Sequence, residues 1–347
     1  MPQVIDLFCG IGGLTRGLLD TGLDVIAGFD VDKTCQYTYE HNNRVKYHLR
    51  DINDVSGDEL LNLYDSNDNY RILVGCAPCQ PFSQMRSKLG EKNEKDEKYN
   101  LLLEFGRLIR DTQPSIISME NVPQIKNTTV FNKFIGILKE LDYHIDYKVI
   151  FCPDYGIPQT RRRFVLLGSQ LGKIEIIKPT CNRKDIHIKD YIGALPTIAA
   201  GEVDLNDPLH RSASLSDINL KRIQNSIPGG TWRDWPEELR CKCHKKASGK
   251  SYSSVYGRMT WEQIGPTITT QFYNYGTGRY GHPEQDRALS LREGAILQTF
   301  PPDYVFIDPE SKFVFSDIAR HIGNAVPVKL GEVIGRTICK HLENYKV

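Results

Sequence analysis

The first half of the chain alternates short apolar runs with segments of helical periodicity, and this pattern limits the folds open to it. Alternating strands and helices favour a parallel sheet that is covered by helices. The strand-like runs are residues 4–8, 25–29, 72–74, 116–119 and 164–167, and the helical segments are residues 14–19, 101–110 and 131–141.

The alternation ends near residue 180. Residues 181–315 are rich in Gly, Pro, Asn, Arg and aromatic residues and have no sustained helical period, and a closing helix is expected at 328–341. With 347 residues, of which 40% are hydrophobic, the chain can form two cores. We therefore predict a two-domain α/β protein. A Rossmann-like domain spans 1–190 and is completed by 316–347, and a smaller, loop-rich domain spans 191–315.

Charge is informative locally rather than globally. The chain has 44 Lys and Arg residues against 43 Asp and Glu residues. Residues 221–258, however, contain nine basic and three acidic residues, an excess of six positive charges. Such a segment suits a polyphosphate backbone, although a solvated loop would look the same.

Several classes of protein are disfavoured. No apolar stretch is long enough to cross a bilayer, and Asp6 interrupts the region where a signal peptide would be apolar. Nine cysteines without a secretory signal indicate a reduced, cytoplasmic compartment. The triplet Cys241, Cys243 and His244 lacks a second CxxC or HxxxH pair, so we predict no metal and leave its role open.

A glycine-rich loop follows the first strand. The segment Phe8-Cys9-Gly10-Ile11-Gly12-Gly13 precedes a helix, so its backbone can approach a ligand closely. Asp30 ends the next strand, where a carboxylate suits ribose hydroxyls, and Asp51 could accept an adenine amino proton. The loop alone fits a dinucleotide or an adenosyl cofactor. Its spacing departs from GxGxxG, which favours the adenosyl group.

A cysteine follows the strand at 72–74. In Pro78-Cys79-Gln80-Pro81-Phe82-Ser83, prolines bracket the turn and would hold the thiol rigidly toward a bound molecule. A buried structural thiol is the alternative. Three further motifs occur in order: Glu120-Asn121-Val122, Gln159-Thr160-Arg161-Arg162-Arg163 and Gly323-Asn324-Ala325-Val326-Pro327.

Together with the glycine loop, these motifs resemble the cytosine-C5 DNA methyltransferase family, and the resemblance runs from residue 4 to about residue 340. One departure is Ala77, where the family often has proline. The resemblance implies that Cys79 attacks C6 of cytosine and makes C5 nucleophilic. Glu120 would protonate N3, and Arg161 and Arg163 would lie beside the base.

The resemblance also implies S-adenosyl-L-methionine as cofactor and S-adenosyl-L-homocysteine as product. The two ends of the chain should then meet in space, because the last motif returns to the cofactor. The cofactor-binding residues implied are Phe8, Gly10, Gly12, Asp30, Val31, Asp51, Ile52, Pro78, Leu101, Asn324, Ala325 and Val326.

The target base of such an enzyme lies inside a duplex and must be rotated out to be reached. The loop at 80–98 is placed to close over it, with Gln80 and Ser83 as candidate DNA contacts. Arg258 and Arg279 are candidates for reading bases, since arginine contacts to guanine are common. The segment from Arg287 to Glu293 and the motif at Gln298 match the family in a part that orders the recognition region.

The implied partner is double-stranded DNA, and we expect a monomer in the bacterial cytoplasm. Enzymes of this type either accompany a cognate restriction endonuclease or act alone, and the sequence leaves both open. Three rivals stay open. A tRNA cytosine-C5 methyltransferase shares the motifs but usually carries a Cys-Phe-Thr tripeptide, which is absent. A nicotinamide oxidoreductase would leave Cys79 and Glu120 unused. An inactive DNA-binding module would not require the intact set of reacting residues.

Overall fold

The computed structural model describes residues 2–65, 70–78, 97–246, 249 and 254–345. The chain divides into two compact units. The first comprises Met1–Tyr155, Arg162–Thr180 and Val326–Val347, and the second comprises Gly156–Arg161 and Cys181–Ala325. The main boundaries between the two units therefore follow residues 180 and 325, whereas the sequence predicted boundaries after residues 190 and 315.

The first unit contains a seven-stranded sheet with the order β3-β2-β1-β4-β5-β7-β6. Its strands are β1 (Gln3–Leu7), β2 (Asp24–Asp30), β3 (Lys46–Leu49), β4 (Arg71–Gly75), β5 (Ile116–Asn121), β6 (His144–Phe151) and β7 (Arg162–Ser169). The apolar runs predicted as strands lie in β1, β2, β4, β5 and β7, except that Phe8, the last residue of the first run, follows the end of β1.

The predicted parallel sheet is correct for β1 to β5 and wrong for β6 and β7. Strand β7 pairs antiparallel with both β5 and β6. The reason is local: only the short segment 152–161 separates β6 from β7, so the chain reverses directly instead of crossing over through a helix.

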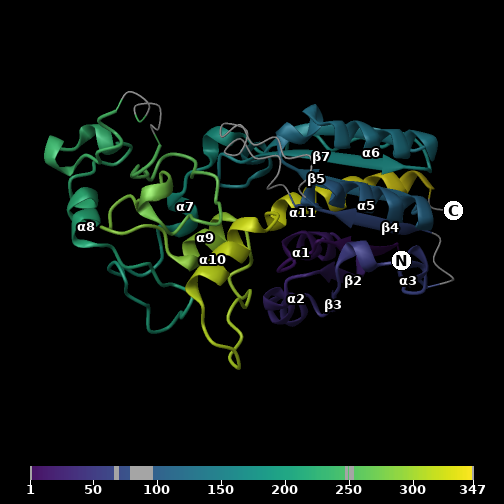
Figure 1. Ribbon diagram of the computed structural model, residues 1–347, viewed down its shortest axis with the longest axis horizontal. Coiled ribbons are helices and arrows are strands. Elements are labelled where there is room, and N and C mark those ends of the chain that lie inside the picture. Colours follow the sequence, from purple (N-terminus) through teal and green to yellow (C-terminus); the bar gives the residue numbers. More distant parts are fainter. Residues whose placement is uncertain (1, 66–69, 79–96, 247–248, 250–253, 346–347) are drawn as a thin grey trace. The chain divides into compact units, whose positions relative to one another are not determined.

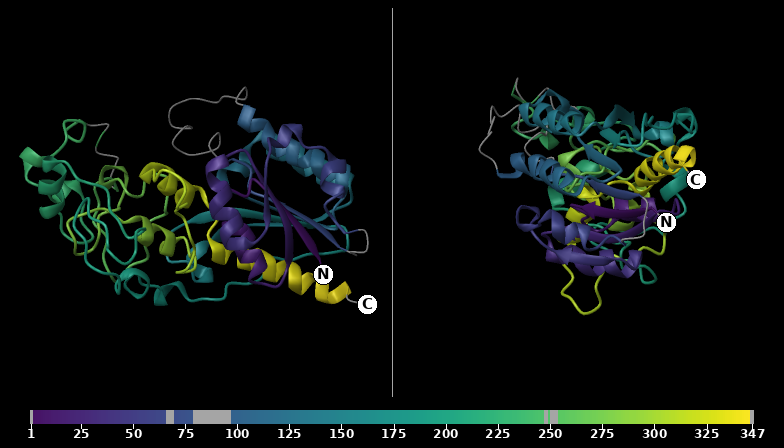
Figure 2. Two further views of the ribbon diagram at one scale, coloured as in Figure 1. Left: turned by 90° about the horizontal axis from the view of Figure 1, so that it is seen from below. Right: turned by 90° about the vertical axis from the view of Figure 1, so that its right-hand side faces the viewer.

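Helices cover both faces of the sheet (Figures 1 and 2). One face packs against α3, α5 and α6, whose buried residues share a core with strand residues such as Leu7, Leu73 and Phe164. Among the residues of this unit that the structure describes, the helices are α1 (Gly13–Leu19), α2 (Gln36–Asn43), α3 (Gly57–Leu61), α5 (Glu97–Thr112), α6 (Thr129–Glu140) and α11 (Val328–Leu342).

The two ends of the chain meet, as predicted, because α11 packs directly on α1. Glycines make this close contact. A Cβ atom added to Gly17 would lie 2.2 Å from the carbonyl oxygen of Val328, and one added to Gly331 would lie 2.8 Å from that of Leu14. The carboxyl-terminal helix thus becomes part of the support for the glycine loop that precedes α1.

The second unit has little regular structure within its described residues. Its helices are α7 (Lys189–Ile192), α8 (Asp217–Gln224), α9 (Leu291–Leu297) and α10 (Phe315–Asn324). A small core forms around Trp232, Trp235 and Tyr275. Glycine- and proline-rich loops with isolated bridges connect these parts, in agreement with the predicted loop-rich character.

Candidate active site

The sheet has a topological switch point between β1 and β4. From β1 the chain proceeds outward through β2 to β3, whereas β4 leads to β5 on the other side. Ligands of open α/β sheets bind beyond the carboxyl ends of the strands at such a point. The glycine loop follows β1 and the segment Cys76–Pro78 follows β4 at this edge, and Asp30 is the last residue of β2.

The loop after β1 has an unusual backbone. Phe8, Gly10 and Gly12 have φ values of 61°, 51° and 85°. Such angles are costly for phenylalanine and easy for glycine. A Cβ atom added to Gly10 would meet nothing within 4 Å, so the loop borders open space.

Asp30 fixes this loop. Its Oδ2 accepts a hydrogen bond from the Gly10 amide at 2.9 Å, and its Oδ1 accepts one from the Asp32 amide at 3.0 Å. Burial raises the pKa of the Asp30 carboxyl, and the two amide hydrogen bonds act in the opposite direction. The next side chain, Val31, is 63% exposed, so an apolar surface lies directly beside this carboxylate.

The other predicted cofactor residues have different surroundings. Asp51 is exposed, and its Oδ1 accepts from the Asn53 amide at 2.9 Å. Ile52 is buried in the core, against which half-buried Leu101 of α5 also packs. Asn324 ends α10 in the second unit.

Asp6 is a buried carboxyl that sequence reasoning did not select for a role. It lies in β1 with no exposed surface, and Thr15 Oγ1 donates to its Oδ2 at 2.6 Å. Burial raises the pKa of Asp6 to about 7, with a smaller contribution from the charge of Asp30. The sequence signal for a role of Asp6 was its position two residues before Phe8, where the glycine loop begins.

Glu120 lies at the end of β5, and its side chain is only 3% exposed. Its Oε1 is 2.8 Å from Arg163 Nε, and its Oε2 accepts a hydrogen bond from Cys76 Sγ at 2.6 Å. The structure therefore brings together two of the four predicted catalytic residues. It adds Cys76, which the sequence analysis had not selected.

Asn121 connects Glu120 to the predicted nucleophile motif. Its Nδ2 donates to the Ala77 carbonyl at 3.0 Å, and its Oδ1 accepts from the Val122 amide at 2.8 Å. Pro78 is half-buried and follows directly. Cys79, Gln80 and Ser83 lie outside the described residues, as does most of the predicted closing loop.

The remaining motif residues meet inside the second unit. Arg161 is buried, and its Nη1 donates to the Ile268 carbonyl at 2.9 Å while its Nη2 is 3.5 Å from the Ala325 carbonyl. The Ala325 carbonyl also accepts from Gln298 Nε2 at 3.0 Å. Gln298 Oε1 in turn accepts from Gln159 Nε2 at 2.8 Å. The sequence analysis named Gln159 and Gln298 only as parts of their motifs and predicted no contact between the two side chains.

Comparison with known proteins decides the family. The sequence model of the C-5 cytosine-specific DNA methylases matches residues 2–340. The chain belongs to this family. It is a DNA (cytosine-5-)-methyltransferase, as the motifs predicted, and the seven-stranded domain is a Rossmann-like methyltransferase domain.

Two relatives and two structures illustrate the similarity. Type II methylase M.HgiDII of Herpetosiphon aurantiacus is 54% identical, with 98% of this chain and 96% of the relative covered. Type II methyltransferase M1.HphI of Haemophilus parahaemolyticus is 31% identical, with 97% and 86% covered. A prophage-encoded E. coli protein has the same fold, with a TM-score of 0.75, 22% identity and coverage of 99% and 100%. So does methyltransferase EhMeth of Entamoeba histolytica, with a TM-score of 0.67, 17% identity and coverage of 100% and 99%.

The two arginines predicted to read bases differ in this DNA methyltransferase. Arg258 is buried, and its guanidinium donates to the carbonyls of His282, Pro283, Ile223 and Ser226 and pairs with Asp286 at 3.1 Å. A base contact would require Arg258 to break these bonds. Arg279 is half-buried, and its Nη1 donates to the carbonyls of Gly229, Gly230 and Arg258.

The motif expected to order the recognition region contains a buried ion pair. Arg287 and Glu293 are both fully buried and form two hydrogen bonds of 2.7 Å. Glu293 also accepts from the Ser290 amide, while Ser290 Oγ accepts from the Glu293 amide, which makes a capping box at the start of α9. The structural role predicted for this motif is thereby confirmed.

No helix within the described part of the chain combines the length and the apolar character needed to cross a membrane.

Proposed function

We propose that this methyltransferase uses S-adenosyl-L-methionine to methylate C5 of a cytosine flipped out of double-stranded DNA, through a bond between Cys79 Sγ and C6. The observation that supports this most is the buried Glu120 at the end of β5. It is joined through Asn121 to the backbone that leads into Cys79. The reaction requires an acid close to the nucleophile, and Cys79 follows in the sequence one residue after Pro78, next to the Ala77 carbonyl that Asn121 holds.

The chemistry needs both groups because C5 of cytosine is a poor nucleophile. Addition of the Cys79 thiolate to C6 makes C5 electron-rich, and a proton supplied at N3 stabilises the adduct. Glu120 would make this proton transfer. Arg163 holds one oxygen of its carboxyl, while the other oxygen accepts from the thiol of Cys76, a weak donor that the base could displace. Arg161 would complete the site from the side of O2.

The residues at the switch point fit the adenosyl cofactor. Open space borders Gly10, a carboxylate lies beside an exposed valine at Asp30 and Val31, and Asp51 offers a second carboxylate. When bound, S-adenosyl-L-methionine supplies a methyl group activated by its positively charged sulfur. Asp30 would accept from the ribose hydroxyls, Asp51 from the adenine amino group, and Val31 would cover an apolar face of the adenosine. The remaining contacts implied for the cofactor, at Ile52, Pro78, Leu101, Asn324, Ala325 and Val326, belong to the same proposal.

The second unit, together with Gln80 and Ser83, would contact DNA. Exposed lysines at 242, 245 and 246 suit phosphates, whereas Arg279 is better placed than Arg258 for a base contact because Arg258 is held inside the unit. We also propose that the protein acts as a monomer in the bacterial cytoplasm. A cognate restriction endonuclease belongs to the same proposal, because the similar M.HgiDII is a Type II methylase. Mapping of methylated cytosines in cells that express each protein would show whether the two share a target.

The covalent step is tested with duplex DNA that contains 5-fluorocytosine at the methylated position. The fluorine cannot leave as a proton does, so the Cys79 adduct should accumulate as a stable protein–DNA conjugate in the presence of the methyl donor. Cys79→Ala should form no conjugate and no product while retaining cofactor affinity, and Cys181→Ala should behave like the wild type. Conjugate formation by Cys79→Ala would exclude this nucleophile, and methylation of tRNA in preference to the duplex would redirect the substrate assignment.

A further inference from the structure

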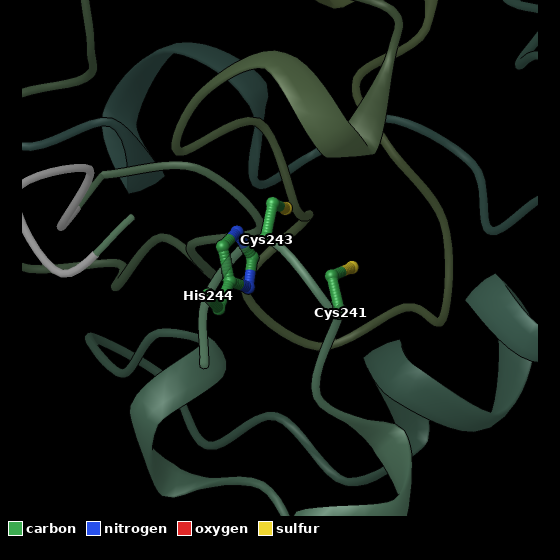
Figure 3. A group of neighbouring side chains, drawn as sticks. All are labelled: Cys241, Cys243 and His244. Carbon is green, nitrogen blue, oxygen red and sulfur yellow. The ribbon is translucent and has the colours of Figure 1, made fainter. Parts of the chain in front are cut away.

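The three side chains left without a role by the sequence analysis lie together in the second unit (Figure 3). Cys241 is half-buried, Cys243 is exposed and His244 is buried. One potential ligand atom from each residue lies within 4.8 Å of those of the other two. Ligands of a tetrahedral zinc ion lie about 3.5–3.8 Å apart, given bonds of roughly 2.3 Å to sulfur and 2.0 Å to nitrogen. Small side-chain rotations would bring the three atoms to those separations.

His244 has an unpaired atom at this place. The side chain is only 6% exposed, and its Nδ1 is buried with no hydrogen-bond partner among the residues that the structure describes. Its ring stacks on Trp232 with centroids 4.3 Å apart and meets Tyr256 edge-on at 5.8 Å. A buried ring nitrogen without a partner costs free energy, which coordination of a cation would recover.

The backbone also holds the turn in a fixed shape. The His244 amide donates to the Cys241 carbonyl at 2.9 Å, and the Lys246 amide donates to the Cys243 carbonyl at 3.3 Å. Gly249 packs so closely that an added Cβ would lie 2.0 Å from the Cys243 carbonyl oxygen. The two sulfurs and the ring are thus presented by a short, tightly packed turn.

We propose that Cys241, Cys243 and His244 bind one zinc ion, which fixes this turn against the aromatic core of the second unit. Two thiolates and a neutral imidazole form an uncharged complex with Zn²⁺, which suits a site flanked by Lys242, Lys245 and Lys246. Both thiols release a proton on binding, and a water molecule can occupy the fourth position. The expectation of no metal relied on sequence spacing, which does not show that the three residues converge.

A bound ion would have a consequence for DNA. It would hold the three exposed lysines of the turn in one arrangement, and lysines on a fixed surface neutralise phosphates more effectively than lysines on a loose one. This consequence rests on the proposed contact between the second unit and DNA, whereas metal binding itself does not.

The first experiment measures metal directly. The full-length protein, purified under reducing conditions without chelator, should contain about one zinc ion per chain, as measured by inductively coupled plasma mass spectrometry. After stripping, Co²⁺ should bind with a thiolate-to-cobalt charge-transfer band and release protons. Cys243→Ser should lose the band and most of the zinc, and the matched variant Cys181→Ser, at an exposed cysteine of the same unit, should keep both. A wild-type protein that takes up no Co²⁺ after full reduction would overturn the proposal, as would a Cys243→Ser variant that binds zinc normally.

The second experiment separates the ion from its proposed effect. Protein stripped of metal should bind DNA more weakly at low salt. The slope of log K against log salt concentration should also become shallower, by roughly 0.9 for each phosphate that is no longer neutralised. Affinity for S-adenosyl-L-methionine should stay unchanged and would report that the first unit is intact. If the purified protein contains zinc but removal of the metal leaves DNA binding unchanged, the zinc site is retained and its role in DNA binding is rejected.

Discussion

The Nε atom of Arg163 lies 2.8 Å from Oε1 of Glu120, on two neighbouring antiparallel strands. The Glu120 side chain is 3% exposed and that of Arg163 is 14% exposed, so the pair is shielded from solvent. The arginine therefore fixes the orientation of the carboxyl group, while Cys76 contacts its other oxygen.

Replacement of Glu120 by Gln tests its role in proton transfer. The amide keeps the shape and can still lie beside Arg163, but it cannot supply a proton to N3. We expect a decrease in turnover of about 10²-fold or more, because this is the usual scale for loss of a general acid. Single-turnover methylation with saturating DNA and cofactor measures this. Glu140→Gln, at an exposed residue of α6 paired with Arg110, should keep the wild-type rate. A near-normal rate for Glu120→Gln would remove this residue from the mechanism.

Replacement of Asp30 by Asn tests the cofactor loop. The change removes the negative charge expected to accept from the ribose and weakens the acceptor of the Gly10 amide. Affinity for S-adenosyl-L-methionine should decrease on the order of 10-fold, about 1.4 kcal/mol. Calorimetry measures it, and a raised KM with little change in kcat should accompany it. Asp24→Asn, at the opposite end of β2, is the matched control. Equal cofactor affinity in the two variants would contradict the assignment.

How far the sequence predicts this fold depends on where each strand lies. The central strands β1, β4 and β5 are buried apolar runs and were found from composition alone. The two strands that were missed, β3 and β6, are the edges of the sheet. Strand β6 is mostly exposed or half-buried, so polar residues interrupt its first half and an apolar run occurs only at its end, in Val149–Phe151. The short connection at 152–161 accounts for the antiparallel pairing of β7 with β6, but the insertion of β7 between β5 and β6 depends on contacts with a distant strand that no local pattern indicates.

The site shows a similar division. Motif residues whose spacing encodes a turn, such as Gly10 and Gly12, can be identified from the sequence alone. Contacts between distant segments cannot, because nothing local indicates that Cys76 bonds to Glu120. Arg258 illustrates the opposite limit: a basic residue on a glycine-rich segment looks available for DNA until its carbonyl partners are known.

Asp6 gives a prediction for the dependence of stability on pH. Its pKa is raised to about 7 in the folded protein, chiefly by burial, against an ordinary value near 4. Between these values the folded state binds more protons than the unfolded state. Stability from this group is therefore fully present below pH 4 and is lost as the pH rises toward 7.

Asp6→Asn should remove that part of the pH dependence. Between pH 5 and pH 8 the wild type should lose about 2–3 kcal/mol more of its free energy of unfolding than the variant. Urea unfolding at pH 5, 6, 7 and 8 measures the difference, with Asp20→Asn, at the exposed end of α1, as the control. Parallel curves for wild type and Asp6→Asn would show that the buried carboxyl does not titrate in this range.

The contact between α1 and α11 gives the last prediction. In Gly17→Ala the new methyl group would meet backbone atoms of α11, at 2.2 Å from the Val328 carbonyl oxygen and 2.6 Å from the Glu332 amide nitrogen. Backbone cannot rotate away, so the helices must separate. We expect a loss of about 1–3 kcal/mol or more, measured as a lower Tm.

Gly136→Ala is the matched substitution because Gly136 lies in α6 and an added Cβ would meet nothing within 4 Å. There the alanine should stabilise the helix by roughly 0.5–1 kcal/mol. The two variants make the same chemical change, so opposite shifts in Tm would isolate the close helix contact as the cause. Separation of α11 from α1 also disturbs the support of the glycine loop, so Gly17→Ala should weaken cofactor binding, whereas Gly136→Ala should not. A Gly17→Ala protein with an unchanged Tm would show that the helices are not packed this closely.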